Sequence, residues 1–161
     1  MPAAKNTDKV PIARVASVNK NCVALIRRAA ITTEDSIEEI IRKIALADSR
    51  AIQTTAERLD VKSFKNVVDA WNKASNIGIF GLASSGYVAM DLQLKLNRQG
   101  KNAIAWRDVH NALTSLSLLG PGDALVVISH SGTTVDAVDV MQEFKNRGVT
   151  IILITNALRS P

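Results

Sequence analysis

The fold of this chain is decided by the stretch Ala124-Leu125-Val126-Val127-Ile128-Ser129-His130-Ser131-Gly132-Thr133-Thr134. Its first five residues are an unbroken apolar run, which predicts a strand buried on both faces. Apolar residues then recur at helical spacing from Val135 to Phe144. The hydroxyl-bearing residues therefore fall in the turn between a buried strand and a helix.

That turn has the chemistry of a phosphate cradle. Backbone N–H groups at the start of a helix lack partners within the helix, the helix end is positive, and several hydroxyl groups surround Gly132. The alternative is an ordinary helix N-cap, because Ser and Thr are the usual residues at that position. The stretch 129–134 by itself leaves both interpretations open.

A second turn of the same kind occurs earlier in the chain. The short apolar run Ile77-Gly78-Ile79-Phe80 is followed by Gly81-Leu82-Ala83-Ser84-Ser85-Gly86, and a helical pattern then continues to about Gln99. In a parallel sheet, both turns lie at the carboxyl ends of their strands. If the two strands are neighbours at a switch point of the topology, both helix N-termini face one crevice.

Short apolar runs alternate with helical patterns from Ile77 onward, which predicts a doubly wound α/β fold with a parallel sheet of about four strands. Two helices precede the sheet. The first starts at Ser36 and Glu39, which are spaced as a capping box, and carries an apolar stripe for core or dimer contact. The predicted strands are 77–82, 102–106, 124–129 and 149–155, and the predicted helices are 36–59, 86–99, 110–119 and 134–147. A second helix follows the first before residue 77, with one side formed by Phe64, Val67, Val68 and Trp71, which we expect to belong to the core.

Composition narrows the class of protein. The 161 residues carry a net charge of +5, and much of the excess lies in residues 1–32, which we interpret as a solvated basic tail rather than a nucleic-acid arm. Cys22 is the only cysteine, so no disulfide forms within the chain, which favours a cytoplasmic protein. No apolar stretch is long enough to span a membrane or to act as a signal peptide. The sequence indicates no metal site and no cofactor.

The pattern from about Thr33 to Pro161 resembles a sugar isomerase (SIS) domain of the kind found in RpiR-type transcriptional regulators. The matching segments are the first loop at 81–85, the S-x-S-G-x-T loop at 129–134, Arg107 to His110, Leu119 to Asp123, and the helix start at 35–41. This resemblance implies a flavodoxin-like sheet and a phosphosugar-binding sensor domain over residues 33–161 that is not an enzyme. It also implies a homo-oligomer.

The resemblance assigns roles to individual residues. Ser85, Ser129, Ser131 and Thr134 would donate hydroxyl protons to the phosphate, with Ser84 and Thr133 beside them. We expect His110 to contact the ligand or to cap a helix. We expect the side chain of His130 to point away, since the backbone is the useful part of that loop.

The sequence departs from the family pattern in three places. Position 83 is Ala where the family usually has Gly. Residues 1–32 are too few to form the family's helix-turn-helix domain, so we expect DNA binding only through a domain that this chain lacks. The SIS domain is expected to be incomplete after Pro161, which would leave the strand at 149–155 with an unpaired edge.

Two enzymatic interpretations compete with the sensor. Gly81 to Gly86 spells G-x-A-x-x-G, and Asp108 follows the next strand, which is a loose dinucleotide-binding pattern. It leaves the hydroxyl cluster at 129–134 unexplained. The stronger alternative is an aldose–ketose sugar-phosphate isomerase, with His110 and Asp108 as the nearby acid–base candidates.

Overall fold

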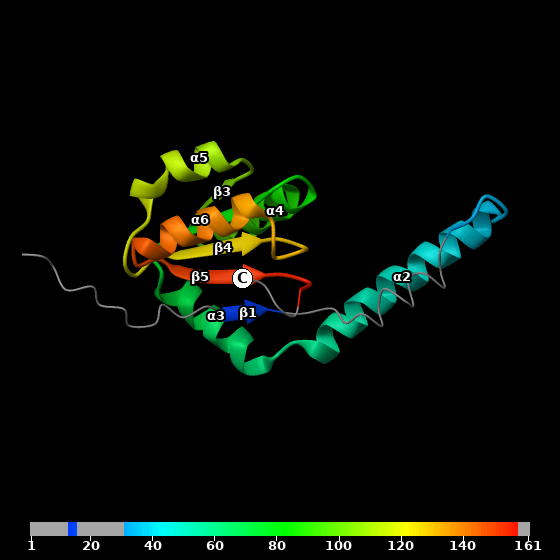
Figure 1. Ribbon diagram of the computed structural model, residues 1–161. Helices are drawn as coiled ribbons and strands as arrows, with labels where there is room; N and C mark the ends of the chain where they lie inside the picture. Colours follow the sequence, from blue (N-terminus) through cyan, green and yellow to red (C-terminus); the bar gives the residue numbers. More distant parts are fainter. Residues whose placement is uncertain (1–12, 16–30, 158–161) are drawn as a thin grey trace, which may run out of the picture.

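The computed structural model describes residues 13–15 and 31–157. Its centre is a five-stranded sheet, in which every neighbouring pair of strands is parallel and the order is β1-β5-β4-β2-β3. The strands are β1 (Ala13–Val15), β2 (Asn76–Gly81), β3 (Asn102–Trp106), β4 (Ala124–Ile128) and β5 (Thr150–Ile154). The helices are α2 (Ile37–Arg58), α3 (Val61–Lys73), α4 (Ser84–Arg98), α5 (Val109–Thr114) and α6 (Val135–Asn146), with a 3-10 turn η1 (Leu116–Leu118) (Figure 1).

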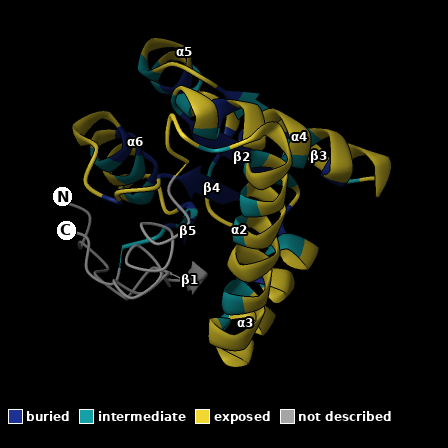
Figure 2. Ribbon diagram, turned by 90° about the vertical axis from the view of Figure 1, so that its right-hand side faces the viewer, coloured by how far each residue is buried: buried dark blue, intermediate teal, exposed yellow. Residues whose placement is uncertain are grey.

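Helices cover both faces of the sheet, which is why the central strands β2, β4 and β5 are buried along nearly their whole length. On one face, Val140 and Phe144 of α6 pack with Leu125 and Val127 of β4. On the other face, α3 and α4 pack against the opposite side chains of β2 and β4. Figure 2 shows the buried residues gathered along the strands beneath these helices. The predicted doubly wound α/β architecture is confirmed.

The edge of β5 is paired, so the expectation of an unpaired strand at 149–155 was wrong. Strand β1 lies alongside β5 with Ala13 opposite Ile152 and Val15 opposite Ile154. A strand of three residues within a basic segment carries no periodicity that sequence inspection can detect. The weak helical pattern of the basic stretch 13–30 does not give a helix at Ala13–Val15, and the remaining residues of that stretch lie outside the described part of the chain.

The opposite edge of the sheet is closed by side chains of α4. The N–H of Ala103 donates to Asn97 Oδ1, and the N–H of Ala105 donates to Gln93 Oε1, both at 2.9 Å. These N–H groups face away from β2, where a further strand would otherwise bind them. The amides of α4 thus end the hydrogen-bond ladder at β3.

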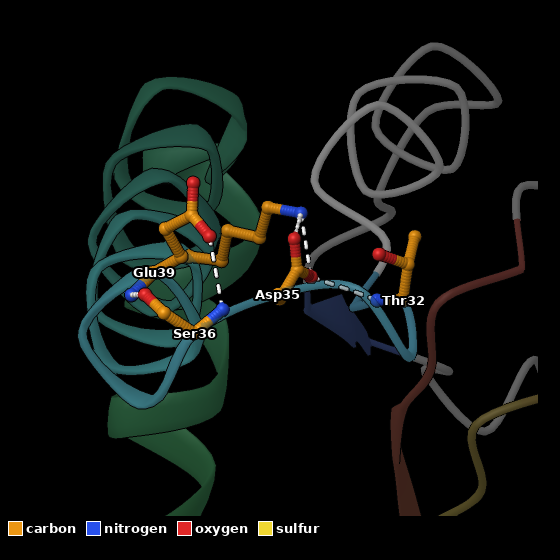
Figure 3. A network of polar contacts seen from close by, with 5 residues as sticks. Thr32, Asp35, Ser36 and Glu39 are labelled. Carbon is orange, nitrogen blue, oxygen red and sulfur yellow. Dashed lines mark hydrogen bonds and ion pairs between the residues drawn. The ribbon is translucent and has the colours of Figure 1, made fainter.

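Helix α2 begins at the predicted capping box. The Ser36 Oγ accepts from the N–H of Glu39, and the Glu39 carboxylate accepts from the N–H of Ser36 (Figure 3). Asp35 forms an ion pair with Lys43 at 2.7 Å and accepts from the N–H of Thr32. These contacts fix the entry of the chain into the helix.

The apolar stripe of α2 does not enter the core. No residue of α2 is buried, and Ile37, Ile41 and Ile52 are 72%, 62% and 72% exposed. Figure 1 shows the helix running away from the sheet. The core interpretation of this stripe was wrong, and its role as an interface stays a prediction.

Helix α3 packs through part of the predicted face. Val67 is buried and Trp71 is packed against the core, whereas Phe64 and Val68 are exposed. The expectation that all four belong to the core is therefore only half confirmed.

Candidate functional site

The two hydroxyl-bearing loops meet at the switch point of the sheet. Strands β2 and β4 are neighbours, with Gly81 opposite Ile128. From β2 the chain crosses through α4 to β3, and from β4 it crosses through α6 to β5 in the other direction. The carboxyl ends of two such strands leave a crevice between the loops that follow them.

The crevice has a volume of about 330 Å³. It brings together four of the predicted ligand residues, Ser85, Ser129, Ser131 and Thr134. Ser84, Thr133 and His110 do not line it, although Ser84 and Thr133 lie on the same loops. The remaining lining residues are Leu82, Ala83, Ile128, His130 and Ala137.

The second loop gathers its hydroxyl groups at one place. The oxygen of Thr134 lies 3.3 Å from that of Ser131 and 3.5 Å from that of Ser129. Ser129 is buried, and its hydroxyl oxygen accepts from the N–H of Gly132 at 3.1 Å. The Ser131 oxygen accepts from the N–H of Thr133. The Thr134 hydroxyl is thus within hydrogen-bond distance of both serine hydroxyls, and the three groups form a polar wall that fits the oxygens of a phosphate group.

The two helices that begin at the crevice are left without side-chain caps. The N-cap residues of α4 and α6, Ala83 and Thr134, make no capping hydrogen bond. By contrast, Ser36, Asp60 and Asp108 cap α2, α3 and α5 with their side chains. The ordinary N-cap interpretation of 129–134 thus loses its support, because the Thr134 hydroxyl faces its neighbours' hydroxyls rather than the helix.

Close packing explains the glycines of the first loop. A Cβ on Gly81 would lie 2.5 Å from the carbonyl oxygen of Ser85, and one on Gly86 would lie 2.8 Å from the carbonyl oxygen of Gly81. Ala83, between them, has φ 49 and is the only non-glycine residue with positive φ in the described part of the chain. The chain therefore turns sharply from β2 into α4, at a position where glycine is the less strained residue.

The candidate acid–base residues lie away from the crevice. Asp108 Oδ1 accepts from the N–H of Asn111 at 2.8 Å, so its carboxylate is the cap of α5. His110 is exposed on the first turn of that helix. Neither residue lines the crevice, so the geometry supports neither a ribose-binding Asp108 nor an acid–base pair at this place.

His130 is among the residues that line the crevice, and the direction of its side chain stays a prediction. Its carbonyl oxygen accepts from the N–H of Asn156 at 3.2 Å and from the Thr155 hydroxyl at 3.4 Å. These bonds fix its backbone to the end of β5.

A second hollow of about 490 Å³ lies beside β3, between α4 and α5. The Arg107 guanidinium carbon lies 4.2 Å from the ring centroid of Tyr87, and an Arg107 N–H donates to the Met90 sulfur. Arg107 also passes over Gly86, where a Cβ would lie 3.1 Å from its Cγ. Arg107, the first residue of the segment 107–110 that resembles the family, therefore packs against the first turns of α4.

Within 13–15 and 31–157, no three His, Cys, Asp or Glu side chains come together as a metal site would require. Over the same residues, no helix combines the length and the apolar character needed to cross a bilayer.

A hydroxyl-lined crevice between two uncapped helix N-termini, at the switch point of a doubly wound sheet, is an arrangement that favours an anion in an α/β domain. Residues 71–161, more than half of the chain, match the family model described as the SIS domain. The chain belongs to the SIS domain family.

Relatives by sequence include an HTH-type transcriptional regulator of Caldanaerobacter subterraneus subsp. tengcongensis, 37% identical over 131 residues. Another from Thermotoga maritima is 35% identical over 130 residues. Each alignment covers 81% of this chain and 46% of the relative. The chain therefore spans less than half the length of the curated relatives it matches.

Solved structures share the fold. The Vibrio vulnificus NanR protein complexed with ManNAc-6P is 29% identical with a TM-score of 0.73, over 86% of this chain and 50% of NanR. The sugar isomerase domain of an RpiR transcription factor from Sphaerobacter thermophilus is 23% identical with a TM-score of 0.59, over 63% of this chain and 57% of that domain.

Proposed function

We propose that this chain is the phosphosugar-binding sensor domain of an RpiR-type transcriptional regulator, that it acts in the cytoplasm, and that it is not a catalyst. The observation that carries the proposal is the crevice formed by Ser85, Ser129, Ser131 and Thr134 between two uncapped helix N-termini. Hydroxyl groups and positive helix ends favour an anionic group such as a phosphate. NanR, which was solved with a phosphosugar, and the HTH-type relatives support the same assignment.

The proposed ligand set also includes three residues that do not line the crevice, Ser84, Thr133 and His110. Ser84 and Thr133 offer backbone and hydroxyl groups on the two loops, and His110 follows β3 at the same carboxyl edge of the sheet. DNA contact in such a regulator is proposed to come from a helix-turn-helix part other than the SIS domain.

The sensor is favoured over an isomerase by what lines the crevice. Isomerisation of a sugar phosphate requires a general base and an acid partner beside the sugar carbons. Among the described residues that line the crevice, none is Asp, Glu, Lys or Arg, and His130 lies in the phosphate loop. A pair of acid and base groups is therefore not formed there by the described residues.

We also propose that the domain forms a homo-oligomer, in which a second copy of the chain covers the exposed isoleucines of α2. The 22-residue helix α2 has no buried side chain and so lacks the tertiary packing that supplies most helical stability in proteins, although it carries an exposed stripe of isoleucines. Light scattering of the purified protein tests this, with Ile41→Glu expected to shift the mass toward the monomer. A wild-type protein that is monomeric at all concentrations would contradict it.

The binding proposal is tested by calorimetry with ManNAc-6P, glucose 6-phosphate and ribose 5-phosphate. Ser131→Ala and Ser85→Ala are each expected to weaken the tightest of these ligands about tenfold, because each removes a hydrogen bond to a charged group. Ser117→Ala, at an exposed serine of η1, is the matched control and should leave the affinity unchanged. Purified protein should not interconvert aldose and ketose phosphates, and sustained turnover would favour the isomerase.

A further inference from the structure

We infer that Arg107, the first residue after β3, supplies positive charge to the anion in the crevice from outside it, although its side chain lines the second hollow. The inference rests on the proposed phosphosugar function and adds a residue that acts on the anion through α4 rather than by contact. Arg107 belongs to the segment 107–110 that resembles the family, yet the proposed ligand set takes only His110 from that segment.

The crevice by itself balances only part of the charge of a phosphate. Among the described residues that line it, none is Lys or Arg. The two helix N-termini each supply a partial positive charge of about half an elementary charge. A phosphate monoester carries close to two negative charges above its second pKa of about 6. Positive charge held just outside the crevice therefore contributes to the binding of such an anion.

The side chain of Arg107 is held along the first two turns of α4. A Cβ on Gly86 would lie 3.1 Å from the Arg107 Cγ and 3.3 Å from its Nε, so the side chain crosses the helix at Gly86. The guanidinium carbon lies 4.2 Å from the ring centroid of Tyr87, and an N–H donates to the Met90 sulfur at 3.6 Å. Gly86 directly follows Ser85, which lines the crevice. The charge is therefore fixed beside the end of α4 that faces the crevice.

The charge of Arg107 is not cancelled by a carboxylate in contact with it. Neither of the two ion pairs among the described residues includes Arg107. The neighbouring Asp108 caps α5, where its carboxylate accepts from the N–H of Asn111 at 2.8 Å. The guanidinium therefore keeps a field that reaches the start of α4.

A cation beside a helix N-terminus is unfavourable, because both are positive, and acidic residues are the favoured choice in a first turn. The first turn of α4 has no acidic residue, whereas that of α2 contains Glu38 and Glu39. An anion in the crevice reverses the sign of this arrangement, since the helix end and the guanidinium both attract it. A position that violates a local preference in this way is where a functional role is expected.

The experiment measures, by calorimetry at about pH 8, the binding of inorganic sulfate and of the tightest sugar phosphate named above, which is then a dianion. Wild type is compared with Arg107→Gln, which removes the charge, and with Arg107→Lys, which keeps it. Arg98→Gln is the matched control, because Arg98 is an exposed arginine in the last turn of the same helix. Each protein is measured from about 0.02 M to about 0.5 M NaCl, since salt screens a charge that acts through space.

Arg107→Gln is expected to weaken both ligands about fivefold at low salt, and the loss should shrink toward unity at high salt. Arg107→Lys should stay within about twofold of wild type, and Arg98→Gln should not differ from it. Unchanged affinity in Arg107→Gln, or an equal loss in both Arg107 variants that does not vary with salt, would overturn the inference while leaving phosphosugar binding intact. Absence of wild-type binding to every sugar phosphate would instead contradict the proposed function, and this inference with it.

Discussion

Gly81 and Ser85 approach so closely that a Cβ on Gly81 would lie 2.5 Å from the Ser85 carbonyl oxygen. The end of β2 and the first turn of α4 are thereby pressed together, and this contact sets where Ser85 faces the crevice. Because the nearest atoms are backbone, no side-chain movement relieves a substitution at this glycine.

Gly81→Ala is therefore expected to displace the first loop, to weaken phosphosugar binding by more than tenfold and to destabilise the domain by about 1–3 kcal/mol, as overpacking does. Calorimetry and thermal unfolding measure the two effects. Gly120→Ala is the matched control, since a Cβ at Gly120 meets nothing within 4 Å. Equal behaviour of the two variants would show that the close approach does not position the loop.

Ala83 stores backbone strain at the entrance to α4. With φ 49 and ψ −124 it occupies a sparsely populated region that costs a residue with a Cβ about 1–3 kcal/mol. Ala83→Gly is expected to raise stability by about 1 kcal/mol, measured by denaturant unfolding. Ala89→Gly, in the buried middle of α4, should lower stability by a similar amount, and a loss at both positions would contradict the assigned strain.

The amides of α4 protect the edge of β3. Gln93→Ala with Asn97→Ala leaves the N–H groups of Ala105 and Ala103 without acceptors, at a cost of about 0.5–1.5 kcal/mol for each bond. The double variant should also self-associate more readily, since an open edge pairs with other strands. Gln142→Ala, which removes an exposed amide bond to Asn146, is the control and should change neither stability nor mass in light scattering.

The start of α2 depends on the ionised form of Asp35. The hydrogen bond from Lys43, and then that from the N–H of Thr32, hold the pKa of Asp35 below its ordinary value of 3.8. A lowered pKa in the folded state means that the stabilisation is complete above 3.8 and is lost as pH falls through the lowered value. The protection of the first turn of α2 against hydrogen exchange, relative to the intrinsic rate at each pH, should therefore fall below about pH 4, and Asp35→Asn should remove that dependence. An unchanged acid profile in the variant would place the titrating group elsewhere.

The strands and the hydroxyl loop were predictable because both depend on local sequence. The unbroken run Ala124 to Ile128 can only be buried, and an S-x-S-G-x-T turn after it belongs at a helix start. The switch point follows from the alternation of strands and helices. The fold and the location of the crevice were therefore accessible without coordinates.

Other features depend on contacts between distant segments. The pairing of Ala13–Val15 with β5 joins segments that lie far apart in the chain. The exposure of the α2 isoleucines was equally hidden, because an amphipathic pattern does not say which surface covers it. The missing side-chain caps at Ala83 and Thr134 depend on where the hydroxyl groups lie, which the sequence alone does not specify.

The measurement that tests the account most directly is a calorimetric comparison of each sugar phosphate with its dephosphorylated sugar, on wild type and on Ser131→Ala. If the crevice between the two loops recognises the phosphate, the tightest sugar phosphate should bind at least a hundredfold more tightly than the free sugar, since several charge-assisted hydrogen bonds of about 1.5–3 kcal/mol are involved. Ser131→Ala should reduce that preference. Equal affinity for the phosphorylated and free sugars, unaffected by Ser131→Ala, would contradict the central claim.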